Sequence, residues 1–230
     1  MSERMERKKR QKRNTIIDKA ERIMAKKGYW DMTMDDVAAD ADVAKGTIYL
    51  YFNSKESLCA AVVARIIADM NLAIKENLEG VEGGTARIVA TATAVTEWNM
   101  SHPDKGSVLE NAIMLKFKDV SDPNVREYVS QMSEQLQIMS DGYRMAIAEG
   151  SVRPDLDPLP TAIFLRMAYW VAMNPFRSHE LIMQENGVDR EALLNTAIDL
   201  IYHATHTDAK KHSSIKIKDI NTRQRKAKAS

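Results

Sequence analysis

The stretch VAKGTIYLYF, residues 43–52, concentrates side chains that could bind a nucleic acid. Ile48 and Phe52 lie four residues apart, so on a helix both would face the same apolar backing. The hydroxyls and the cation around them would then face outward, where they can donate hydrogen bonds to bases or phosphates. A glycine among them would let the backbone approach the phosphates closely. The outward set is Lys45, Gly46, Thr47, Tyr49 and Tyr51.

Apolar spacing predicts the helices that would position this stretch. A helical stripe of apolar residues runs from Arg13 to the breaker Gly28 and predicts the first helix. Thr33 can cap a second helix, because Asp36 three residues later completes a pair of the capping-box kind. After the turn sequence DADV, a third short helix is expected at residues 44–50. Two short helices joined by a tight turn match the helix-turn-helix arrangement, whose second helix enters the major groove of DNA.

The rest of the chain is also expected to be helical. Ser54 should cap a fourth helix, which runs from Lys55 to about Leu78. The glycine-rich sequence EGVEGG, residues 79–84, predicts a hinge or joint after it. With nine glycines and six prolines in 230 residues, the sequence predicts an all-α chain with almost no strand. The further helices are expected at residues 85–101, 106–118, 123–149, 158–174 and 189–205.

The sequence DMTMDDVAADADVAKGTIYLYFNSKESL resembles the TetR family of one-component transcriptional regulators. The resemblance covers about residues 13–60 and is specific, because several motif residues agree in their spacing. Two positions depart from the family pattern: Asp42 stands where glycine is common in the turn, and Ala44 stands where serine or threonine commonly caps the recognition helix. The family implies an N-terminal three-helix DNA-binding domain joined to a larger helical domain for ligand binding and dimerisation.

The resemblance also implies which residues bind DNA. Lys45, Gly46 and Thr47 would lie nearest the base edges. The start of the second helix, the two tyrosines and Lys55 would contact phosphates. The flexible basic arm before the first helix would reach the DNA, with the minor groove as one place for it. The full predicted set is Arg13, Thr33, Met34, Val43, Lys45, Gly46, Thr47, Tyr49, Tyr51 and Lys55.

Charge is divided unevenly along the chain, although the formal net charge is only +1. Residues 1–13 contain seven Lys or Arg against two Asp or Glu, and residues 208–230 contain eight against two. The 194 residues between them carry eighteen cations and twenty-eight anions. Two basic ends therefore flank an acidic body. The tail is expected to be disordered, and ends that are merely solvated remain the alternative to ends that bind a partner.

The C-terminal helices offer a candidate ligand pocket and a candidate dimer interface. Their methionines and aromatic residues favour either a packed core or an adaptable cavity for a small apolar or aromatic molecule. Residues 161–173 are apolar nearly all round, and residues 189–205 carry one apolar face, so together they predict a symmetric four-helix interface between two copies. The pocket candidates are Trp98, Met114, Phe117, Met139, Tyr143, Met167 and Trp170.

These features predict four parts and exclude several classes of protein. The single cysteine, Cys59, suits the cytoplasm, and neither a signal sequence nor a membrane span is expected. No catalytic residues, cofactor or metal site is expected, because His203 and His206 have no further ligands nearby in sequence and no nucleophile pairs with a base. The parts are a basic N-terminal arm (1–13), a helix-turn-helix DNA-binding domain (14–58), a helical ligand-binding and dimerisation domain (59–207) and a basic tail (208–230).

The sequence thus favours a ligand-responsive transcriptional regulator that binds double-stranded DNA as a homodimer. A repressor that a small hydrophobic or aromatic effector releases from a palindromic operator is the first hypothesis. A ligand-independent activator or DNA-organising protein with the same DNA-binding domain is the alternative. A helical enzyme is disfavoured, because the sequence offers no catalytic constellation.

Overall fold

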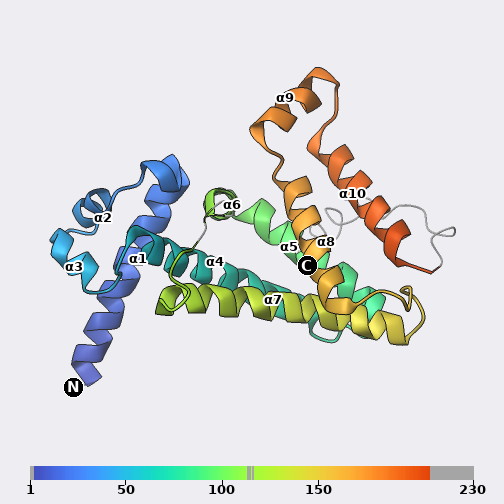
Figure 1. Cartoon of the computed structure of the whole chain (residues 1–230), viewed down its shortest axis with the longest axis horizontal. Coiled ribbons are helices and arrows are strands. Elements are labelled where there is room, and N and C mark those ends of the chain that lie inside the picture. The colour runs from blue at the N-terminus through green and yellow to red at the C-terminus, as the bar shows by residue number, and fades with distance from the viewer. Residues whose placement is uncertain (1–2, 113–114, 116, 208–230) are drawn as a thin grey trace, which may run out of the picture. The chain divides into compact units, whose positions relative to one another are not determined.

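The computed structural model describes residues 3–112, 115 and 117–207, so the tail predicted at 208–230 lies outside the described residues. Among the described residues there are ten α-helices and no β-strand (Figure 1), which confirms the all-α prediction. The helices are α1 (Glu3–Asp31), α2 (Met34–Asp40), α3 (Lys45–Tyr49), α4 (Lys55–Leu78), α5 (Gly84–Ser101), α6 (Pro103–Ala112), α7 (Pro123–Ala148), α8 (Pro158–Met173), α9 (Arg177–Glu185) and α10 (Arg190–Thr205).

α1 begins at Glu3 and not at Arg13, so the prediction of a flexible arm before the first helix was wrong. The residues before Arg13 lack an apolar stripe, but Glu, Lys, Arg and Gln all favour helix. Glu3 and Glu6 also place negative charge at the positive end of the helix dipole. The breaker predicted at Gly28 is a kink with φ of 79°, after which the chain stays helical to Asp31.

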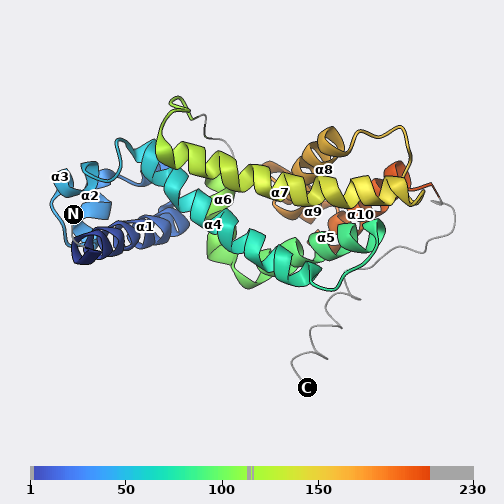
Figure 2. The ribbon, with the colours of Figure 1, turned by 90° about the horizontal axis from the view of Figure 1, so that it is seen from below.

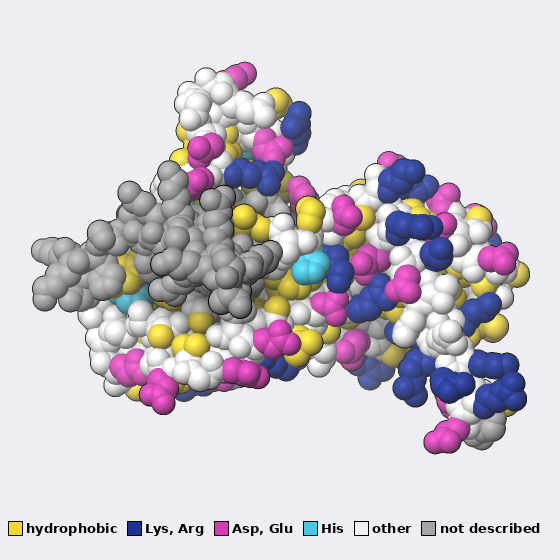
Figure 3. Space-filling model, turned by 180° about the vertical axis from the view of Figure 1, so that it is seen from behind, with side chains coloured by type: hydrophobic (Ala, Val, Ile, Leu, Met, Phe, Trp, Pro, Cys, Tyr) yellow, Lys and Arg dark blue, Asp and Glu magenta, His cyan; other side chains and the backbone are white. Residues whose placement is uncertain are grey.

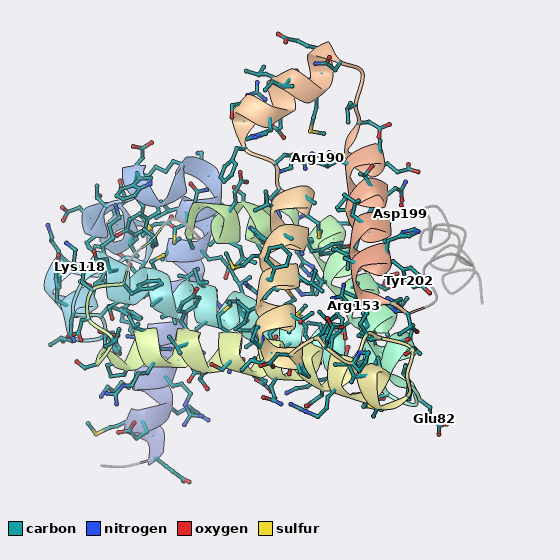
Figure 4. The ribbon with its side chains drawn as sticks, turned by 45° about the vertical axis from the view of Figure 1, so that its right-hand side comes forward. Glu82, Lys118, Arg153, Arg190, Asp199 and Tyr202 are labelled. Carbon is teal, nitrogen blue, oxygen red and sulfur yellow. The ribbon has the colours of Figure 1, made fainter. Side chains whose placement is uncertain are left out.

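Two later helices also differ from prediction. α9 was not predicted, because it is short and its N-cap residue, Phe176, offers no side-chain hydrogen bond that would signal a helix start. An ion pair between Arg190 and Glu180 joins the start of α10 to α9 (Figure 4). α6 begins at Pro103 instead of residue 106, since proline suits the first turn of a helix.

The described chain forms two compact units, whose limits differ from the predicted domain boundary at residues 58–59. The first unit runs from the N-terminus to Ala73 and includes Glu97–Glu134. The second unit comprises Ile74–Thr96 and the chain from Gln135 onward. Because α4, α5 and α7 each contribute residues to both units, no local breaker in the sequence marks the division. The four-part organisation stays a prediction.

α4 is a central helix of the first unit. Leu58, Val62 and Ile66 are fully buried at positions i, i+4 and i+8, which form one face of the helix. Ser54 Oγ accepts a hydrogen bond of 3.0 Å from the N–H of Ser57, as predicted for the N-cap. By length and hydropathy α4 could cross a membrane, but 72% of its apolar window is buried in the fold. Its composition is therefore explained as that of a core helix.

The second unit is organised around α7 and α8. Gly84, the first residue of α5, approaches α7 so closely that an added Cβ would lie 2.0 Å from the backbone nitrogen of Ala146. Just beyond the same end of α7, the N–H of Arg153 donates to the carbonyl of Thr205 at 2.9 Å and so anchors the end of α10 (Figure 4). The buried cluster of this unit consists of Tyr143, Ala146, Val152, Ala162 and Leu165.

Candidate nucleic-acid interface

The capping box predicted at the start of α2 is present. The N–H of Asp36 donates to Thr33 Oγ1 at 3.1 Å, and the N–H of Thr33 donates to Asp36 Oδ2 at 2.8 Å. Lys27 of α1 also donates to this carboxylate, at 2.7 Å. The hydrogen bonds from Lys27 and then Thr33 lower the pKa of Asp36 to about 2, so the cap is ionised at neutral pH. α2 therefore starts at a fixed residue and is tied to α1.

The turn between α2 and α3 uses both residues that depart from the family pattern. Asp42 has φ of 50°, a left-handed conformation that aspartate adopts more readily than most residues other than glycine. Ala44 is the N-cap of α3 and makes no side-chain capping hydrogen bond. The N–H of Val43 donates to the carbonyl of Ala38 at 3.0 Å. Backbone hydrogen bonds thus hold the turn, and position 44 offers no hydroxyl to DNA.

α3 has one buried and one exposed face. Ile48 and Phe52 are 0% exposed, as predicted for the inward anchors. Tyr49 is 45% exposed, and Lys45 and Gly46 are exposed beside it. In two views α3 lies on the outside of the head, by which we mean α1–α3 (Figures 1 and 2). The half-buried residues at the edges of the exposed face are Val43, Thr47 and Tyr51.

Lys45 already has a partner within the head. Its Nζ lies 2.8 Å from Oδ2 of Asp35 in α2, and this hydrogen bond raises the pKa of Lys45. Both side chains are exposed, so a phosphate or base can replace the carboxylate at a small cost in free energy. Contact between Lys45 and DNA would therefore require an exchange of partners.

Arg13 joins three segments of the first unit, and its contact with DNA stays a prediction. Its guanidinium donates to Oδ1 of Asn124 at 2.6 Å and lies 5.3 Å from the centre of the Phe52 ring. Asn124 in turn donates to Ser57 Oγ at 2.9 Å. Burial lowers the pKa of Arg13. The residue therefore ties α1 to the start of α7 and to the segment that follows α3.

Two further residues predicted to contact DNA have side chains that contact other residues of the protein. Met34 is buried, because the start of α2 turns this apolar side chain inward, and its contact with DNA stays a prediction. Lys55 donates to the carbonyl of Trp30 at 3.1 Å, and its Nζ lies 4.3 Å from the centre of the Tyr29 ring. Burial lowers the pKa of Lys55. Thr33 is exposed, although its hydroxyl donates to Asp36 at 2.6 Å.

Trp30 is an exposed residue that the sequence reasoning missed. It is 70% exposed, and its ring packs edge-on against Tyr29 with the ring centroids 5.1 Å apart. The indole N–H is a donor, so an exposed tryptophan beside the capping box can contact a phosphate or sugar. The signal was present in the sequence, since two aromatic residues stand in the short connection between Gly28 and Thr33.

The residues predicted to line a ligand pocket fall in both units. In the first unit, the Trp98 ring stacks on His102 with the ring centroids 4.6 Å apart. The Phe117 ring packs against Tyr128 at 5.1 Å between centroids. Met114 lies outside the described residues. These contacts give Trp98 and Phe117 protein partners, and their contact with a ligand stays a prediction.

The remaining pocket candidates belong to the second unit. Tyr143 is part of the buried cluster, Met139 packs against that cluster, and Trp170 is half-buried. Met167 is 58% exposed, so it faces the outside of α8 and not an interior cavity, contrary to prediction. An open pocket of about 240 Å³ in this unit was not predicted. It is lined by Lys75, Leu78, Glu79, Arg87, Ile138 and Asp141.

Large exposed apolar side chains lie along α8 and at one position of α10, and we call them together the apolar face of α8 and α10. α8 and α10 pack against each other, and Leu200 of α10 is exposed. Contiguous exposed apolar side chains of this kind mark contact with another molecule. The exposed side chains of α8 are Leu159, Ile163, Phe164, Met167 and Val171.

Known proteins share both the head and the helical architecture. The HTH-type transcriptional repressor KstR2 of Rhodococcus jostii is 24% identical over 171 residues, which cover 72% of this chain and 80% of the relative. The fatty acid metabolism regulator protein of Bacillus subtilis is 23% identical over 201 residues, which cover 86% and 97%. The solved structure of the transcriptional regulator FadR from Bacillus subtilis in complex with stearoyl-CoA has a TM-score of 0.63 at 19% identity, covering 84% of this chain and 98% of that one.

The head itself matches a family described as bacterial regulatory proteins, tetR family, over residues 16–62. This range spans the capping box of α2, the turn at Asp42, the exposed face of α3 and the first third of α4. With a helix-turn-helix head of this geometry and a larger helical part after it, the chain belongs to the TetR family of helix-turn-helix transcriptional regulators.

Proposed function

We propose that the chain is a ligand-responsive repressor, which binds a near-palindromic operator as a homodimer in the cytoplasm. One observation carries this proposal: α3 keeps Ile48 and Phe52 fully buried while Lys45, Gly46 and Tyr49 face outward. A short helix backed in this way can enter a major groove and hold donors against base edges and phosphates.

Dimerisation would give the operator its symmetry. Two copies joined through the apolar face of α8 and α10 would present two α3 helices to successive major grooves, about 34–36 Å apart. A two-fold symmetric pair reads a near-palindrome, because each copy meets the same half-site.

An apolar small molecule is the proposed effector. The fatty acid metabolism regulator and the stearoyl-CoA complex among the similar proteins make a long acyl chain the first class to test. An effector that favours a conformer with its α3 helices at another spacing lowers operator affinity, and DNA lowers effector affinity by the same factor.

A ligand-independent activator or DNA-organising protein is the alternative. The cations at both ends of the sequence favour it, since they would add non-specific affinity for any duplex. Such a protein would cover DNA broadly and would not be released by small molecules.

The test starts with selection of duplexes from a random pool by the full chain. In gel shifts with the selected duplex, Lys45→Ala and Tyr49→Phe should each weaken binding by about 1–3 kcal/mol if the contacts are direct. Lys118→Ala is the control, because this lysine is exposed in a segment that follows α6 (Figure 4). If both α3 variants keep full affinity, α3 does not enter the major groove as proposed.

The second test concerns the effector. Stearoyl-CoA should release the selected duplex from the protein. Broad binding that no effector reverses favours the organiser.

A further inference from the structure

The first part of α1 extends beyond the packed body of the helix. Every residue from Glu3 to Lys12 is exposed, and the first buried residue of the helix is Ile16. This segment therefore contributes nothing to the apolar core. A helix of this length is marginal by itself in water, so it forms as a continuation of the packed part of α1. The segment is therefore an exposed helix with an excess of positive charge.

Four of the six cations of this segment share one face of the helix. Arg4, Arg7, Lys8 and Lys12 stand at positions i, i+3, i+4 and i+8, which share one side of an α-helix. We call these four residues the basic stripe. Glu3, Glu6, Lys9 and Arg10 fall outside it by the same helical spacing. At 1.5 Å per residue the stripe is about 12 Å long. Figure 3 shows Lys and Arg side chains gathered over this end of α1.

The cations in the rest of the head are already engaged. In the described residues from Arg13 to Lys55, every lysine and arginine except Lys26 contacts a carboxylate, an amide or a carbonyl. Within the described chain, by contrast, no member of the basic stripe makes an ion pair or a side-chain hydrogen bond. The pairs in the head are Arg13–Asn124, Lys19–Asp40, Arg22–Asp40, Lys27–Asp36, Lys45–Asp35 and Lys55–Trp30.

We infer that the basic stripe is a second DNA-contact element, which lies along the phosphate backbone beside the groove that α3 enters. This inference rests on the proposed function. A helix with side chains is about 10–12 Å across, whereas the minor groove is about 6 Å wide, so the segment cannot enter that groove as a flexible arm would. The N-terminal end of α1 and α3 both lie on the left-hand side of the head in two views (Figures 1 and 2).

DNA fits this surface better than a membrane does. Met5 is the only apolar side chain from Glu3 to Lys12, so the segment lacks the apolar face that a helix on a membrane surface buries. A row of unpaired cations on one helix face can contact the phosphate backbone, and each such contact releases condensed counterions from the duplex.

Two matched double variants test the stripe in the full chain. Arg7→Gln/Lys8→Gln removes one arginine and one lysine from the stripe, and Lys9→Gln/Arg10→Gln removes the same two types from outside it. Binding to the selected duplex is measured by fluorescence anisotropy from about 50 to 200 mM salt. The stripe variant should lower the slope of log affinity against log salt by about 1.8 per subunit, since each lost phosphate contact is worth about 0.9. The control variant should leave the slope close to that of the unaltered chain.

Equal slopes for the two variants overturn the inference, because they show that charge matters without regard to the helix face, or not at all. If the unaltered chain selects no duplex, the proposed function fails. The salt slopes of the two double variants are then compared on a random-sequence duplex, which tests the basic stripe independently of the operator.

Discussion

At the scale of single residues, the exposed face of α3 offers a hydroxyl and accessible backbone to another molecule, and its one lysine is already paired. Lys45 forms an ion pair with Asp35. Tyr49, by contrast, has an exposed ring. Gly46 is exposed on the same helix, with nothing within 4 Å of the position where a Cβ would stand. A glycine inside a helix costs stability, so its presence here suggests that the space above it is needed by another molecule.

Substitution of Gly46 should separate stability from DNA binding. We expect Gly46→Ala to raise the free energy of unfolding by about 0.5–1 kcal/mol, because alanine favours helix and meets no neighbour. Affinity for the selected duplex should fall by about tenfold, equivalent to about 1.4 kcal/mol, because the new methyl group keeps the backbone from the phosphates. Urea denaturation and gel shifts measure the two effects. Unchanged affinity would mean that the backbone of α3 does not approach DNA at this position.

Residues with a strong local signal were predictable from the sequence, whereas residues with a distant partner were not. The capping box of Thr33 and Asp36 is a local pattern, and it was confirmed. The partner of Arg13 is Asn124, which lies 111 residues away in sequence. No property of residues 1–60 by themselves reveals that contact, so the partner of Arg13 within the fold was not predicted.

At the scale of helices, packing and not charge fixes how closely the elements approach. The sequence EGVEGG predicted a hinge, and its glycines turn out to have different uses. Gly80 and Gly83 have φ of 70° and 85°, which suits a turn. Gly84 is instead the residue at which α5 meets α7, and its N–H donates to Glu149 Oε2 at 2.8 Å.

Alanine at this contact should destabilise the second unit. In Gly84→Ala the Cβ would lie 2.0 Å from the nitrogen and 2.5 Å from the Cα of Ala146, so α5 and α7 must move apart. Overpacking of this kind costs about 1–3 kcal/mol. Chemical denaturation monitored by circular dichroism measures the loss.

Gly106→Ala is the matched control within a helix. Its Cβ would stand at an ordinary contact distance of 3.6 Å from Asn99 Oδ1, and we expect stability to stay constant or rise. If Gly84→Ala proves as stable as this control, α5 and α7 are not in close contact in solution.

Helix existence was predicted well where an apolar stripe or a breaker marks the chain, and poorly elsewhere. α4 begins and ends as predicted, because Ser54 and a long apolar face define it. The first residues of α1 have neither mark, and α9, although Pro175 and Gly187 flank it, is short and starts without a capping side chain. Glu3–Lys12 is helical by propensity and by continuity with the packed part of α1, which a search for apolar periodicity does not detect.

At the scale of the whole molecule, the apolar face on α8 and α10 has the composition of an interface. Phe164 is 68% exposed, and Leu200 is 64% exposed. Met167, which the sequence placed in a pocket, lies one turn after Ile163 on the same exposed row. An interior cavity and a surface row look alike in sequence, because both need apolar residues at helical spacing. The structure separates them by exposure.

Phe164→Asp should convert the protein to a monomer. A two-fold interface contains each substituted position twice, so one change places two carboxylates in the contact. An unpaired buried polar group costs about 2 kcal/mol, which gives about 4 kcal/mol in all and about a thousandfold rise in the dimer dissociation constant. Sedimentation velocity measures the mass. Val120→Asp is the control, because Val120 is equally exposed but lies outside α8 and α10. A dimer that survives Phe164→Asp would place the interface elsewhere, and the spacing of two α3 helices would then need another geometry.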